Sequence, residues 1–329
     1  MRLFTHTVGT RGASLTCYIQ EPDEGLKNAT VRPAALILPG GAYMFLSAAE
    51  SEPVALAYAA EGYNTFVLRY TVGPDSPVAA AYEDGQAALG WLRANATDLH
   101  IDPAKIVAVG FSAGGHLAAS LGAFGPERPN ALVLAYPGVE GPTARAGVSL
   151  ADAITPEMPP AFLFGTVGDD VVPARQWLSL LQALESNIVP FESHLYMLGP
   201  HGVSLAKAHT SNGRAAGVSP DTARWFTDSV RFLTAIFGDF LVSGEPQDYS
   251  QLAARATYGP DMPIYRLIEE AGPAAVLEVH IPALLERLRG SAGSAMSLRQ
   301  LSEFAPDHLP TATVERISAD LARFNEVTA

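Results

Sequence analysis

A Gly-x-Ser-x-Gly motif is the most chemically informative feature of this chain. It occupies residues 110–114, between an apolar, largely β-branched run at 106–109 and a run of small residues at 117–120. A strand that turns sharply into a helix at such a motif is a nucleophile elbow, which leaves the serine hydroxyl exposed at the end of the strand. The helix N-terminus directs unpaired N–H groups and partial positive charge at the same place. We therefore predict that Ser112 is a nucleophile rather than part of a glycine-rich structural turn.

A carboxylate is needed next, because a serine hydroxyl reacts only when a base takes its proton and a third group orients that base. In sites that begin at an elbow, the acid follows the serine in the chain. Asp169 and Asp170 come after the apolar run at residues 161–164 and a glycine-bearing turn. Asp169 is favoured because a residue directly after the strand can point back across the sheet ends. Asp170 would then cap the helix that starts near Pro173, or the two roles are exchanged.

The predicted base is His201, which lies in the sequence Gly-Pro-His-Gly after the last apolar run. Glycine and proline on both sides indicate a loop that can carry an imidazole to Ser112. Among the other histidines, His116 falls in the helix after the elbow, where it would line or buttress the pocket. His194 falls inside a strand and His209 in a polar loop. The rest lie far from any strand end of the expected order: His6, His100, His280 and His308.

Two backbone N–H groups must face the oxygen that becomes negative when a serine attacks a carbonyl. One would be the N–H of Ala113, directly after the nucleophile. The other is expected from Pro39-Gly40-Gly41-Ala42-Tyr43, where the glycines let the backbone approach a substrate closely. Three tyrosines near these segments are pocket residues or ordinary packing aromatics: Tyr43, Tyr70 and Tyr136.

The first 238 residues alternate between predicted strands and helices. This order implies a mostly parallel sheet with helices on both faces, and ligands bind such sheets beyond the carboxyl ends of the strands. Residues 140–160 and 207–220 interrupt the pattern, and the first of these segments is predicted to fold over the site as a small cap. The predicted strands are 34–38, 64–69, 131–135, 161–164 and 191–198, besides the one before the elbow, and the predicted helices are 48–60, 82–94, 173–186 and 221–237.

A different pattern begins beyond Gly244. Apolar residues recur there at i, i+3 and i+4 spacing, which predicts three or four amphipathic helices separated by Pro273, Gly290, Gly293 and Pro306. We therefore expect a catalytic domain at residues 1–240 and a small all-helical domain at 245–329. No cluster of polar residues marks a site in the second, so we expect it to pack on the first domain or to form a homo-oligomer.

Composition excludes several classes of function. Apolar residues make up 48% of the 329 residues and the net charge is −13, with no patch rich in Lys or Arg. Nucleic acid and anionic membranes are therefore not expected partners. Cys17 is the single cysteine and falls in the apolar run 15–19, which excludes an intrachain disulfide and a cysteine-based metal site. No signal-peptide pattern or apolar stretch of transmembrane length occurs, so a cytoplasmic location is predicted.

Residues 1–238 resemble the α/β-hydrolase superfamily, and within it the bacterial carboxylesterases of the acetylxylan-esterase and feruloyl-esterase-like group. One departure concerns the loop after the strand at 34–38, because many relatives have His-Gly-Gly-Gly where this chain has Pro39 and Ala42 at the outer positions. The matching segments are Leu38–Tyr43, Phe66–Tyr70, Asp102–Ile106, Gly110–Ala118, Asp169–Pro173 and Gly199–Gly202.

The resemblance implies a catalytic triad of Ser112, Asp169 and His201, and an oxyanion hole from the N–H groups of Ala113 and Gly41 or Gly40. It implies a serine esterase that needs no metal or organic cofactor and cleaves short acyl esters, such as acetyl groups on sugars. Two other functions compete with this one. The same groups could hydrolyse amides, as in an arylformamidase or a small peptidase, or the chain could be a non-catalytic binding or assembly protein on a hydrolase frame.

Overall fold

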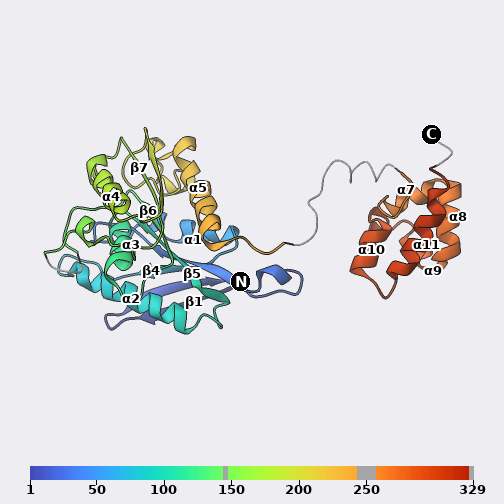
Figure 1. Ribbon diagram of the computed structural model, residues 1–329, viewed down its shortest axis with the longest axis horizontal. Coiled ribbons are helices and arrows are strands. Elements are labelled where there is room, and N and C mark those ends of the chain that lie inside the picture. The colour runs from blue at the N-terminus through green and yellow to red at the C-terminus, as the bar shows by residue number, and fades with distance from the viewer. Residues whose placement is uncertain (144–146, 243–256, 326–329) are drawn as a thin grey trace. The chain divides into compact units, whose positions relative to one another are not determined.

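The computed structural model describes residues 1–143, 147–242 and 257–325. The chain divides into two compact units, Met1–Val242 and Ser243–Ala329 (Figure 1). The first unit contains every residue that the sequence analysis selected for chemistry.

Within the described residues, eight strands form one sheet in the order β1-β2-β4-β3-β5-β6-β7-β8. Neighbours from β4 through β8 run parallel, whereas β1 and β2 form an antiparallel hairpin that joins the sheet at β4. The predicted mostly parallel α/β fold is therefore confirmed. The strands are β1 (Arg2–Val8), β2 (Ala13–Ile19), β3 (Arg32–Leu38), β4 (Asn64–Arg69), β5 (Ile101–Phe111), β6 (Ala131–Ala135), β7 (Ala161–Thr166) and β8 (Phe191–Tyr196).

Helices cover both faces of this sheet (Figure 1). On one face, α2 (Val78–Ala94), α3 (Ala113–Phe124) and α4 (Ala174–Ser186) bury leucines against the strands. On the other face, α1 (Glu52–Ala60) and α5 (Pro220–Phe237) bury larger aromatic side chains, such as Tyr58 and Trp225. The sheet is thus enclosed on both sides, and only its edges and strand ends remain for binding.

The predicted helix at residues 48–60 is two elements. A 3-10 turn, η2 (Ala48–Glu50), is followed by Ser51, and α1 begins at Glu52. Pro53 explains the break, because a proline lacks the N–H that a helix interior needs and fits only the first turn. The break leaves Glu50 outside the regular helix.

All the predicted site residues lie just beyond the carboxyl ends of parallel strands. Gly40 and Gly41 follow β3, Ser112 follows β5, Asp169 follows β7 and His201 follows β8. Because those ends meet at one edge of a parallel sheet, segments far apart in the sequence converge there.

The second unit is helical and has its own apolar core, which includes Leu267, Leu277 and Ile317. Residues 257–325 contain five α-helices, one more than the upper number predicted. Short helices that follow one another closely read as a single periodic run in the sequence. Pro273 does not separate two helices but lies in the first turn of α8, where its missing N–H costs nothing. The helices are α7 (Ile264–Glu269), α8 (Ala271–His280), α9 (Pro282–Leu288), α10 (Leu298–Phe304) and α11 (Thr311–Ala322).

Candidate active site

The turn from β5 into α3 holds Ser112 in a strained backbone conformation, with φ 53° and ψ −116°. Side chains at the flanking glycines would not fit. A Cβ on Gly110 would lie 2.2 Å from the carbonyl oxygen of Gly114, and a Cβ on Gly114 would lie 2.0 Å from that of Leu38. The predicted elbow is therefore present in the fold, and both glycines are required by backbone contacts.

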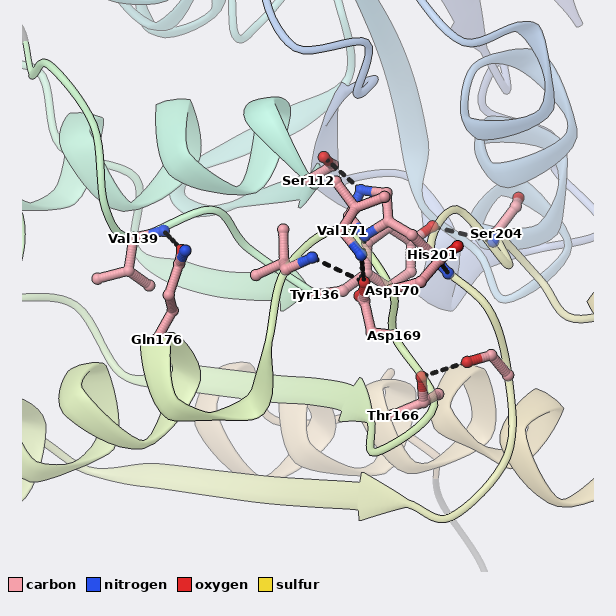
Figure 2. Close-up of polar contacts among 12 residues, drawn as sticks. Ser112, Tyr136, Val139, Thr166, Asp169, Asp170, Val171, Gln176, His201 and Ser204 are labelled. Carbon is pink, nitrogen blue, oxygen red and sulfur yellow. Dashed lines mark hydrogen bonds and ion pairs between the residues drawn. The ribbon is translucent and has the colours of Figure 1, made fainter.

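His201 lies between Ser112 and Asp169 (Figure 2). Its Nε2 is 2.7 Å from Ser112 Oγ and its Nδ1 is 2.8 Å from Asp169 Oδ2. The Asp169 side chain is 3% exposed and that of His201 is 16% exposed. With Nδ1–H donated to the carboxylate, Nε2 is free to accept the proton of the serine hydroxyl. The structure thus brings together the three side chains that the sequence analysis selected.

The two adjacent aspartates have different partners. Asp169 accepts hydrogen bonds from the imidazole and from the backbone N–H groups of Val171 and Val172. Burial alone would raise the pKa of the Asp169 carboxyl, but these hydrogen bonds outweigh it, and the net shift of the pKa is downward. Asp170 instead accepts a long 3.4 Å bond from the His201 backbone N–H and does not cap α4. Asp169 is therefore the carboxylate that can orient the imidazole and stay ionised beside it.

The loop after β3 is fixed by hydrogen bonds on two successive peptide groups. In the first, Tyr70 Oη donates to the Pro39 oxygen at 2.5 Å and the Gly40 N–H donates to Glu50 Oε2 at 2.8 Å. In the second, the Gly40 oxygen accepts the Ser47 N–H at 2.9 Å. Because C=O and N–H point in opposite directions in a trans peptide, the Gly41 N–H faces away from Ser47.

Two backbone N–H groups near Ser112 have no acceptor among the described residues. Glu50 already takes the N–H of Gly40, whereas among the described residues no acceptor is bonded to the N–H of Gly41 or of Ala113. Gly41 also lines the cleft in front of Ser112. The resemblance named these two amides first, and their role in an oxyanion hole stays a prediction, whereas the N–H of Gly40 is bonded to Glu50.

A cleft of about 860 Å³ opens in front of Ser112 and His201. One wall is the segment from Gly41 to Pro53, and the other is the loop after the histidine, from His209 to Arg214. The described residues of the predicted cap, 140–143 and 147–160, do not line this cleft. Leu150 and Met158 pack instead into the core beside α3 and α4. The second irregular segment, 207–220, contributes the wall.

Tyr70 and Tyr136 are buried, Tyr43 is partly buried, and none of the three lines the cleft. His116 is likewise buried, and its Nδ1 is bonded to Tyr43 Oη at 2.7 Å, so it buttresses the loop after β3. Its Nε2 has no partner in the described part of the chain.

Sequence analysis did not select Glu50, and its only signal was a carboxylate inside an alanine-rich apolar run.

Comparison with known proteins agrees with this fold. The BD-FAE family model matches residues 25–129. The crystal structure of MGS-M1, an α/β-hydrolase enzyme from a Medee basin deep-sea metagenome library, is 39% identical, with a TM-score of 0.66; the match covers 71% of this chain and 98% of that one. The chain belongs to the α/β-hydrolase family.

Other α/β-hydrolase relatives are esterases. The carboxylesterase Cest-2923 from Lactobacillus plantarum WCFS1 is 27% identical with a TM-score of 0.67, over 74% of this chain and all of that one. An acetyl ester-xyloside bifunctional hydrolase from Caldicellulosiruptor lactoaceticus is 28% identical with a TM-score of 0.60, over 70% of this chain and 90% of that one. This α/β-hydrolase is therefore esterase-like. The chain spans about a third or less of the length of the curated relatives that it matches.

The described residues contain no group of three or more His, Cys, Asp or Glu side chains placed to hold a metal ion. In the same residues, no helix combines the length and the apolar character that crossing a membrane requires.

The buried His116 predicts a pH dependence of stability. Burial lowers its pKa from 6.5 to about 4, so between these values the unfolded chain binds a proton that the folded protein excludes. The free energy of unfolding therefore falls as the pH falls through this window, by about 3 kcal/mol for a shift of this size. Urea unfolding of the wild type and of His116→Gln, measured at several pH values from 7 to 4, should show a flatter dependence in the variant. Parallel curves would contradict this account of His116.

Proposed function

We propose that this protein is a serine carboxylesterase that cleaves short-chain acyl esters through an acyl-enzyme on Ser112. The observation that carries the proposal is the unbroken series from Asp169 through His201 to Ser112, at 2.8 and 2.7 Å, beside the two unbonded amides of the oxyanion loop and the elbow. Each group in this series has the chemical character that its place requires.

Acylation begins with attack by Ser112 Oγ on the ester carbonyl. His201 Nε2 accepts the hydroxyl proton as the new C–O bond forms, and the imidazole becomes positively charged. Asp169 holds Nδ1–H and stabilises that charge through the hydrogen bond it already makes. The negative oxygen of the tetrahedral intermediate accepts hydrogen bonds from the N–H groups of Gly41 and Ala113. The intermediate then collapses, and His201 gives its proton to the leaving alcohol.

Deacylation reverses these roles on a water molecule. His201 Nε2 takes a proton from water, which attacks the acyl carbonyl and passes through a second oxyanion in the same hole. Collapse breaks the bond to Ser112 and returns the proton to its hydroxyl, so the carboxylic acid product leaves and the enzyme is restored. No step in this sequence calls for a metal ion or organic cofactor.

Acetyl esters of sugars are the substrates we favour. The resemblance to the acetylxylan-esterase group supports them, and so does the likeness to an acetyl ester-xyloside bifunctional hydrolase. Polar residues line one wall of the same cleft as Ser112, among them Thr210, Ser211 and Asn212. Such a wall suits a hydroxyl-rich alcohol. Self-association through residues 245–329 and a cytoplasmic location stay predictions.

A substrate panel tests the reaction class. We expect p-nitrophenyl acetate and acetylated xylo-oligosaccharide to be hydrolysed with higher kcat/KM than longer acyl esters and than the amide N-formylkynurenine. Rates of acid release measured in parallel on the same preparation decide the comparison. Preference for N-formylkynurenine would move the assignment to amide hydrolysis, and the absence of any turnover would reject the proposal.

Ser112→Ala and His201→Ala should each abolish turnover while leaving the thermal midpoint within a few degrees, because each removes a reacting group and little packing. A fluorophosphonate probe should label the wild type at Ser112 and should not label Ser112→Ala. Absence of labelling in the folded wild type would favour a non-catalytic binding protein. Near-wild-type activity in either variant would refute its assigned role.

The adjacent aspartates provide a matched pair. Asp169→Asn should lower kcat on the order of 10⁴-fold, because the amide no longer orients the imidazole or stabilises its charge. Asp170→Asn, one residue away and bonded only to backbone, should stay within a few fold of the wild type. Steady-state kinetics on p-nitrophenyl acetate measures both. An equal loss in the two variants would remove the distinction between them.

A further inference from the structure

Glu50 is a carboxylate buried in η2, only 3% exposed, beside the proposed catalytic groups but outside their series. Burial raises the pKa of its carboxyl, and hydrogen bonds from Tyr136 and from the Gly40 N–H oppose that rise. Burying a carboxylate costs free energy unless its oxygens are well bonded. Both Glu50 oxygens are bonded, and their partners belong to different parts of the site.

Oε2 of Glu50 bonds to the loop after β3. It accepts the Gly40 N–H at 2.8 Å, and a Cβ on Gly40 would lie 3.0 Å from Ser112 Cβ. Ser47, three residues before Glu50, donates its N–H to the Gly40 oxygen. The segment from Ser47 to Glu50 therefore fixes both backbone groups of Gly40, and with them the direction of the Gly41 N–H.

Oε1 of Glu50 is linked to the loop that carries the histidine through Tyr136, which follows β6. It accepts the Tyr136 hydroxyl at 2.7 Å. That hydroxyl oxygen accepts the Ser204 N–H at 2.9 Å (Figure 2). The Tyr136 ring lies 5.1 Å from the His201 ring in an edge-on arrangement. Ser204 Oγ also donates to the Ala49 oxygen at 2.6 Å. The histidine loop is thus attached to η2 both directly and through Tyr136.

Backbone strain accompanies these contacts. Tyr136 has φ 36° and Ser204 has φ 50°, in the left-handed region that non-glycine residues rarely adopt. Such conformations persist only where the surroundings hold them, and they gather at functional sites. Here they allow the Ser204 N–H to donate to the Tyr136 hydroxyl, which in turn donates to Glu50.

We propose that Glu50 is a positioning residue that joins the Gly40–Gly41 loop to the His201 loop through its two carboxylate oxygens. This inference rests on the proposed esterase function. The carboxylate accepts the Gly40 N–H directly, and it reaches the His201 loop through the Tyr136 hydroxyl, which it also accepts. A glutamine has one oxygen, so its NH₂ group must face either the Gly40 N–H or the Tyr136 hydroxyl, and one of the two links is lost or inverted. The Gly41 N–H and the His201 imidazole would then no longer be held in position relative to Ser112.

Glu50→Gln tests this role against Asp84→Asn. Asp84 is a suitable control because it is also a buried carboxylate, 1% exposed, whose Oδ2 accepts the N–H and the hydroxyl of Thr71 and no site residue. On p-nitrophenyl acetate, Glu50→Gln should lower kcat about 10–100-fold with KM changed less than about threefold, because the lost interaction acts in the transition state. Asp84→Asn should lower thermal stability without this change in kcat.

Butylboronic acid gives a second readout, because it adds to the serine oxygen as a tetrahedral anion that resembles the transition state. Its affinity for Glu50→Gln should fall by about the same factor as kcat/KM. A variant that merely loses stability would bind it as the wild type does under conditions where the protein is folded. Unchanged affinity together with unchanged kcat in Glu50→Gln would overturn the inference.

Tyr136→Phe examines the histidine side of the link and serves if Glu50→Gln does not fold. Its control is Tyr58→Phe, which removes another buried hydroxyl, bonded to Ser229 at 2.7 Å and to none of the site residues. Tyr136→Phe should lower kcat and boronate affinity, and Tyr58→Phe should not. Equal effects in the two variants reject the role of Glu50. Inactivity of the wild type on every ester would instead reject the esterase function itself.

Discussion

The whole arrangement depends on the strained backbone of Ser112. A positive φ at a serine is tolerated only because β5 is at the centre of the sheet and α3 is buried along its length, so the turn between them cannot relax. The two glycines at the ends of the motif make that turn sterically possible. Once the hydroxyl and the first amide of α3 are fixed in this way, every other group need only be brought to them.

The parallel sheet brings the other groups of the site to Ser112. His201 is 89 residues from Ser112 in the chain, and Asp169 is 32 residues from His201. Both arrive at the same edge because each follows the carboxyl end of a strand. The loop after β3 joins them from the strand beside β5. Loops alone would hold these groups loosely, but Val203 and Leu205 bury the chain just after the histidine, and the two backbone amides beside Asp169 fix its carboxylate.

Short sequence motifs predicted those parts of the site whose structure depends on neighbouring residues. The elbow could be found from five residues, because its requirements are steric and lie within the motif itself. Asp169 and His201 could be found because chain order and strand ends restrict the choice to a few positions. The choice between Asp169 and Asp170 needed the structure, since adjacent residues point in different directions and the sequence gives no direction.

Contacts between distant segments that no motif marks were beyond prediction. Glu50 looked like one acidic residue in an alanine-rich helix, because its partners, Gly40 and Tyr136, are ten and 86 residues away. Tyr136 looked like a packing aromatic for the same reason. The strand β1 was not predicted because its half-exposed residues are mixed in polarity. The cap was misplaced because residues such as Leu150 can serve a core as well as a lid.

The cleft wall from His209 to Arg214 differs from the opposite wall because its side chains do not hold the proposed catalytic groups in place. Asn212 and Arg214 are exposed, and none of the hydrogen bonds that orient Ser112, His201 or Asp169 passes through a side chain of this segment. Under the proposed function, substitutions at these exposed positions can reshape the space for the alcohol while leaving the reacting groups undisturbed. The fold thereby places substrate contacts and catalytic contacts on different segments of the chain.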